Sequence, residues 1–108
     1  SQLLAHSSGR LFWIGNISPQ NPTGNGPRYP LVIGEIERRT GALRRESIVA
    51  LDDRGPGDSE FLALSNFHAR EDRETREVVV HLARQGVNSV KGKHDFTADA
   101  SLYRIAVL

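Results

Sequence analysis

Residues 29–52, YPLVIGEIERRTGALRRESIVALD, decide how this chain folds. Over 30–38 the apolar residues fall on both faces of an extended strand, which is the pattern of a strand covered on two sides. Gly41 can adopt the positive φ of a tight turn, and 43–52 then returns as a second strand. The stretch therefore predicts an antiparallel hairpin.

The same pattern recurs toward the C-terminus. FLALSNFHA at 61–69 and REVVVHLAR at 76–84 are joined by the polar turn REDRET at 70–75. We expect a second hairpin, whose apolar side is formed by Val78, Val80 and Leu82. Two further strands are expected, and they are RLFWIGN at 10–16 and LYRIAVL at 102–108. With no helix expected beyond about two turns, the fold class is all-β with antiparallel strands.

Two segments are expected to be loops. Residues 18–30 contain four prolines and two glycines, which excludes both a helix and a central strand. Residues 53–59 (DRGPGDS) form the second loop. Loops on a rigid sheet are the usual place for ligand-binding groups.

Composition narrows the classes of partner and cofactor. The charges of the 14 basic and 13 acidic residues nearly cancel, so the chain has no overall positive electrostatic field of the kind that attracts nucleic acid. Cysteine is absent, which excludes a disulfide framework and leaves the redox compartment open. The four histidines have no metal-ligand spacing, and no phosphate loop is present, so we expect no metal and no cofactor. No apolar run reaches the length of a membrane span.

Residues 1–108 are long enough for one domain, but six strands are too few to close a core around a catalytic site. Two architectures remain open from the residues alone: a small barrel or sandwich, and blades of a propeller that shield one another. Since the chain does not begin with methionine, we expect it to be an internal or trimmed piece. In isolation it should aggregate or oligomerise, because apolar sheet faces would be left in water.

Four segments carry a family resemblance. These are LFWIGN at 11–16, GNGPRYPLVIGEIE at 24–37, LSNFHAREDRET at 64–75 and LYRIAV at 102–107. Together they resemble the C-terminal end of sialidase-like, BNR-repeat proteins. The resemblance implies a six-bladed β-propeller with a glycosidase site at its central opening. Residues 1–108 would then be a partial domain of one to two blades, with the remaining blades and a carbohydrate as partners.

The resemblance also implies a function. The chain would be the C-terminal fragment of a sialidase-like glycoside hydrolase, inactive alone because the acid/base aspartate lies on the early blades. The chain lacks the Asp-box motif Ser-x-Asp-x-Gly-x-Thr-Trp. The alternative is a non-catalytic propeller module that binds carbohydrate or protein.

Five residues are candidates for binding the carbohydrate. Arg28 and Tyr29 lie where the long loop meets a strand, and a guanidinium there can hold a sugar carboxylate through two parallel hydrogen bonds. Alternatively Arg28 pins the loop, and the Tyr29 ring packs on neighbouring prolines. Asn16 and Asn66 both end a strand, where the amide can bind a sugar hydroxyl or cap loop backbone. His68 is the one histidine considered for the site.

Two other features are expected to be structural. Trp13 is expected in the core rather than as a platform for a sugar. Glu71, Asp72 and Glu74 are expected to form a solvated salt-bridge network with Arg70, Arg73 and Arg76, which interleave with them, rather than a catalytic pair.

Overall fold

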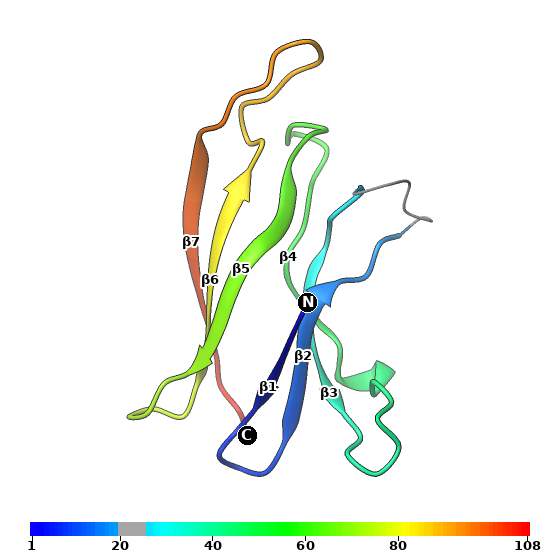
Figure 1. The fold of residues 1–108 in the computed structure, drawn as a ribbon, viewed down its shortest axis with the longest axis vertical. Coiled ribbons are helices and arrows are strands. Elements are labelled where there is room, and N and C mark those ends of the chain that lie inside the picture. Colours follow the sequence, from blue (N-terminus) through cyan, green and yellow to red (C-terminus); the bar gives the residue numbers. More distant parts are fainter. Residues whose placement is uncertain (20–25) are drawn as a thin grey trace.

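A computed structural model describes residues 1–19 and 26–108 and shows two antiparallel sheets packed face to face (Figure 1). The four-stranded sheet contains β1 (Gln2–Ala5), β2 (Leu11–Asn16), β3 (Leu31–Ile36) and β4 (Val49–Asp52). The three-stranded sheet contains β5 (Ala63–Glu71), β6 (Val78–Gln85) and β7 (Ala98–Ile105). In each sheet the strands lie in chain order, so every strand pairs with the next one in sequence.

The core lies between the two sheets. Alternate residues of each strand face the opposite sheet, and Ile14, Leu31, Leu64, Val78 and Val80 are completely buried there. Val78, Val80 and Leu82 form the expected apolar side of β6. Burying a Val or Leu side chain contributes about 1.5–3 kcal/mol, so this shared core makes the two sheets one unit.

Both predicted hairpins are confirmed. β3 pairs with β4 and β5 pairs with β6, in each case antiparallel. Gly41 has the expected positive φ, at 75°. The turn of the second hairpin begins after Glu71, because β5 continues to that residue. The all-β class is therefore confirmed, whereas neither sheet closes on itself in the part of the chain that the structure describes.

The strand β1 was not predicted. It has only four residues, too few for an alternating pattern to be recognised, and it forms because it pairs with β2 across a turn. Gly9 in that turn has a φ of 91°. The pairing is thus decided by contact with β2 rather than by the β1 sequence.

The predicted strand over 43–52 is wrong in its first half. Leu43 contributes one isolated bridge, Arg45–Ser47 forms a short 3-10 helix, and the regular strand begins only at Val49. The Ser47 hydroxyl accepts the Glu35 N–H at 2.8 Å, so a side chain replaces the strand partner that β3 would otherwise have there.

The last strand begins and ends earlier in the chain than the sequence pattern predicts. It was expected over 102–108, but β7 begins at Ala98 and ends at Ile105. Its first residues are polar or small and carry no alternating apolar signal, yet they pair with β6 from Gln85 onward. Tertiary pairing overrides local preference here.

Side-chain hydrogen bonds tie the two sheets together at both edges, between their first strands and between their last strands. The amide of Gln2 donates to the carbonyl of Ala69 at 2.8 Å and accepts its N–H at 3.0 Å, which imitates a backbone pairing between β1 and β5. The Tyr103 hydroxyl donates to Asp52, which links β7 to β4. Burial, followed by the Asp52 carboxylate, raises the pKa of Tyr103. Arg84 Nε lies 3.1 Å from the same carboxylate without the alignment of a hydrogen bond, so it acts there as an ion pair.

The outer face of the four-stranded sheet is largely apolar. Trp13 lies on this face, half-buried, and is not part of the core between the sheets where it was expected. Its indole covers Gly15, where an added Cβ would lie 2.5 Å from Trp13 Cζ2, so only glycine fits beneath the ring. Leu3, directly opposite Trp13 on β1, is 62% exposed.

Among the described residues no helix is long and apolar enough to cross a membrane. The predicted loop over 18–30 lies partly outside the described residues, since 20–25 are not described.

Candidate functional site

The connections between the strands lie at two opposite ends of the molecule. The connections that follow β4 and β6, and the described part of the one that follows β2, lie at one end, whereas those that follow β1, β3 and β5 lie at the other (Figure 1). We call the first the loop end and the second the turn end. At the loop end a cleft of about 430 Å³ is lined by apolar residues, including Phe61 and Leu62, and by the polar residues Arg28, Arg54, Glu60, Ser65 and Gln85.

Arg28 is held against the start of β5. Its carbonyl accepts the Leu64 N–H at 2.9 Å, and its Nη1 donates to the Ser65 hydroxyl at 3.1 Å. The backbone bond crosses from the loop to the three-stranded sheet, so the position of Arg28 is set by both. The guanidinium lines the cleft, as expected of a binding group on a loop.

Arg54 is a second arginine of the cleft that was not singled out from the sequence. Its guanidinium lies over the ring of Tyr29, with Cζ 3.9 Å from the ring centroid, and Nη2 donates to the Tyr29 hydroxyl at 2.8 Å. Nη1 donates to the carbonyl of Glu60. Tyr29 therefore supports Arg54, and its ring also packs against the core. An arginine in the glycine-rich loop DRGPGDS was the available signal.

The loop that carries Arg54 is braced from within. The Asp58 carboxylate accepts the Gly55 N–H at 2.8 Å, and the Gly55 carbonyl accepts the Asp58 N–H at 3.1 Å. The Ser59 hydroxyl donates to the carbonyl of Ser89 at 2.5 Å, which joins this loop to the one after β6. Such bracing lowers the entropy lost when a ligand binds.

Asn16 lies beneath the cleft rather than in its lining. Its Nδ2 donates to the carbonyl of Pro30 at 3.0 Å and to the carbonyl of Leu64 at 3.3 Å. Both amide hydrogens are used by these two bonds, which connect β2 to the start of β3 and to β5. The backbone-capping interpretation therefore describes the observed contacts of Asn16.

Asn66 and His68 lie elsewhere, in a shallow groove of about 340 Å³ on the outer face of the three-stranded sheet. His81 lies directly opposite His68 in this groove, a pairing that could not be read from their separation in sequence. The five predicted residues are thus divided between the loop end and this outer groove.

The acidic turn at the other end forms ion pairs, as expected: Glu71 pairs with the expected Arg76, whereas Asp72 pairs with Arg104, which was not among the expected partners. The Ser7 hydroxyl and N–H donate to Glu71 at 2.5 and 2.7 Å, and these bonds lower the pKa of its carboxyl group. The Glu74 N–H, followed by Arg104, lowers the pKa of Asp72. The Arg76 guanidinium lies 3.4 Å from the Glu71 carboxylate.

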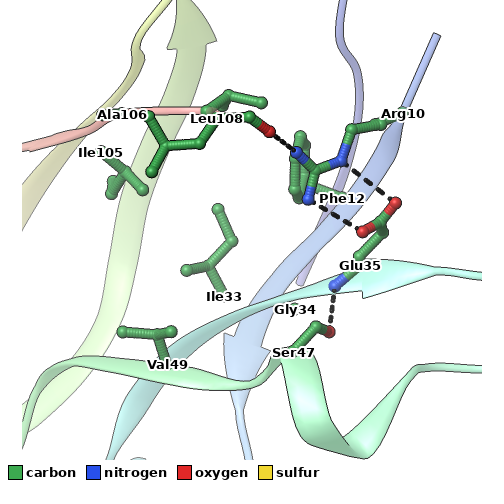
Figure 2. A pocket seen from close by; sticks show the side chains of 11 residues that line it. Arg10, Phe12, Ile33, Gly34, Glu35, Ser47, Val49, Ile105, Ala106 and Leu108 are labelled. Carbon is green, nitrogen blue, oxygen red and sulfur yellow. Dashed lines mark hydrogen bonds and ion pairs between the residues drawn. The ribbon is translucent and has the colours of Figure 1, made fainter. Parts of the chain in front are cut away.

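A smaller cavity of about 240 Å³ opens between the sheets at the turn end (Figure 2). Phe12, Ile33 and Ile105 line it, and Arg10 closes one side. Arg10 donates to both carboxylate oxygens of Glu35, at 3.2 and 2.9 Å, and this bidentate pair lowers the pKa of Glu35. Because the charges of this cavity satisfy each other, it is a weaker candidate than the loop-end cleft.

Within residues 1–19 and 26–108 no group of three or more His, Cys, Asp or Glu side chains is placed to hold a metal ion. Comparison with known proteins gives no match to any family model, curated protein or solved structure.

Proposed function

We propose that this chain is the C-terminal part of a sialidase-like, carbohydrate-acting β-propeller protein and that its loop-end cleft binds a sugar. The observation that carries the proposal is the pair Arg28 and Arg54, which line one cleft at the loop end. Two guanidiniums suit a carboxylate or a set of hydroxyls, because each presents parallel donors in a fixed plane.

The arrangement of the strands supports the propeller part of the proposal. Both sheets are antiparallel with their strands in chain order, and their first strands, β1 and β5, contact each other. Stacked blades have this layout, in which each sheet shields the next. The outer face with Leu3 and Trp13 is apolar enough to pack against a further sheet, so the remaining blades are the proposed partners.

The cleft does not hold the two carboxyl groups that glycosidases commonly use. In the described part of its lining Glu60 is the one acidic residue. Most glycosidases need two carboxyl groups at a set separation, whereas sialidases use a tyrosine as nucleophile, and the resemblance places their acid/base aspartate on the early blades. The chain therefore supplies binding groups, and the proposed hydrolase takes its acid/base from the other blades. The same observation favours the second candidate, a non-catalytic propeller module that binds carbohydrate.

The test compares arginine-to-lysine variants in the full-length protein. Arg28→Lys and Arg54→Lys should each weaken binding of an acidic sugar by about 1.5–3 kcal/mol, because lysine keeps the charge and loses the parallel donors. Isothermal titration calorimetry against sialic acid, a neutral hexose and a uronic acid measures the effect. Arg39→Lys, in the turn at the opposite end, is the matched control.

Two results would contradict the proposal. If neither variant changes affinity for any sugar in the set, the cleft does not bind carbohydrate. If Arg28→Lys lowers the melting temperature and leaves affinity intact, Arg28 anchors its loop and the site lies on other blades.

A further inference from the structure

The outer groove brings two histidines together. His68 on β5 and His81 on β6 are directly opposite in the antiparallel register, and both side chains are exposed on the outer face of the three-stranded sheet. Residues paired in this way have Cβ atoms about 4.5–5.5 Å apart, close enough for two imidazoles to reach one atom between them. Asn66 lies two residues before His68 and so projects from the same face.

Small residues leave space beside the two imidazoles. Ala83 lies opposite Asn66, and Ala100 lies opposite Ala83 on the next strand. Together with the two histidines they line the groove of about 340 Å³. On the side of β7, Leu102 lies opposite His81 and is 52% exposed, so a bound ion with its shell of water would meet the methyl groups of the alanines on one side and the leucine side chain on the other.

The amide and the two imidazoles in this groove have no partners elsewhere in the described part of the chain. Across residues 1–19 and 26–108, the side chains of Asn66, His68 and His81 form no hydrogen bond or ion pair with the protein. By contrast the buried His6 is held on both sides, by Ser8 at 2.8 Å and by the Arg76 carbonyl at 2.6 Å. Two adjacent unengaged imidazoles are available as ligands.

We propose that this groove binds a divalent transition-metal ion such as Zn²⁺ or Ni²⁺, ligated by one ring nitrogen each of His68 and His81. Imidazole suits these ions, whereas Mg²⁺ and Ca²⁺ require oxygen ligands. Water completes the coordination shell, and the Asn66 amide accepts a hydrogen bond from a metal-bound water. The proposal is independent of the carbohydrate function assigned to the loop-end cleft.

The charged residues on the same face allow a test of whether the bound ion is a cation or an anion. Arg70 and Arg104 flank the next row of the sheet, one on each side of Val79. Arg104 is paired with Asp72 and Glu77 at 3.1 and 3.2 Å, and exposed Arg70 is screened by water. Removing the Arg70 charge should strengthen binding of a cation and weaken binding of an anion.

The experiment titrates the chain with Zn²⁺ and Ni²⁺ by calorimetry and follows the histidine ring resonances by NMR, with Mg²⁺ as the hard-cation control. We expect one transition-metal ion per chain, shifts confined to the rings of His68 and His81, and no response to Mg²⁺. His68→Asn or His81→Asn should lower affinity at least about tenfold, since the second ligand binds as an intramolecular step. His94→Asn, which removes a histidine that contacts Phe61 at the loop end, should leave affinity unchanged.

Circular dichroism of each variant establishes that it is folded, and these positions are exposed, so the fold should persist. Arg70→Gln should tighten metal binding. Unchanged affinity in both His68→Asn and His81→Asn would overturn the proposal. The proposal would also be overturned if the groove bound no metal ion and instead bound inorganic phosphate with an affinity that Arg70→Gln lowers.

Discussion

Asn16 and Asn66 are equivalent as site candidates in the sequence, where both are expected to end a strand, yet the structure gives them opposite roles: Asn16 ends β2, whereas Asn66 lies within β5. Asn16 donates two hydrogen bonds to carbonyls of Pro30 and Leu64, while Asn66 projects into the outer groove. Asn16→Ala should therefore destabilise the fold, and Asn66→Ala should not. The pair is a matched test, because the chemical change is identical.

The magnitude follows from the number of bonds lost. Each neutral hydrogen bond contributes a net 0.5–1.5 kcal/mol, so two of them give about 1–3 kcal/mol of unfolding free energy. In a domain of this size each kcal/mol moves Tm by about 4–8 °C. Asn66→Ala, an exposed substitution, should stay within about 0.5 kcal/mol of the parent.

Urea denaturation followed by circular dichroism measures both variants, and thermal melts provide the second measurement. The m-value should be unchanged, since the same surface is exposed on unfolding. Equal midpoints for Asn16→Ala and Asn66→Ala would refute the reasoning. That result would mean that the two Asn16 bonds do not hold β2 to β3 and β5, and Asn16 would return to the list of ligand-binding residues.

Two further predictions concern acid stability and the loop end. The pKa of Glu71 is lowered by Ser7, so its stabilisation is complete above the unfolded pKa of about 4.5 and is lost as pH falls through the lower folded value. Glu71→Gln should therefore show a shallower loss of Tm than the parent between pH 5 and pH 2, and parallel curves would contradict this assignment. Gly86 has a φ of 74°, and an added Cβ would lie 2.3 Å from the carbonyl oxygen of Phe61, so Gly86→Ala should lower stability by more than about 1 kcal/mol. Gly92→Ala, with a φ of 80° but nothing within 4 Å, isolates the backbone cost, and an equal effect of the two substitutions would show that the close contact does not matter.

The local pattern of the sequence was sufficient to predict the two hairpins. Alternation of apolar residues identifies strands, and Gly41 marks the turn between two of them, because both signals depend only on neighbours in sequence. The local pattern was insufficient to predict β1, because this strand is too short to show alternation. It also failed for the first half of 43–52, because the Ser47 hydroxyl accepts the hydrogen bond that a strand partner would otherwise accept. Each of these exceptions depends on a partner elsewhere in the chain.

The candidate site shows the same division. The sequence by itself determined that the chain is all-β and that Arg28 and Tyr29 lie where a long loop meets a strand, since proline, glycine and alternation act locally. Only the tertiary structure decided that Arg54 stacks on Tyr29, that Asn16 is used up by two carbonyls, and that His68 faces His81. Those contacts join residues 13 to 48 positions apart, and their geometry depends on strand register and on how the two sheets pack. Register and packing are set by the whole core, so no single segment of the sequence carries them.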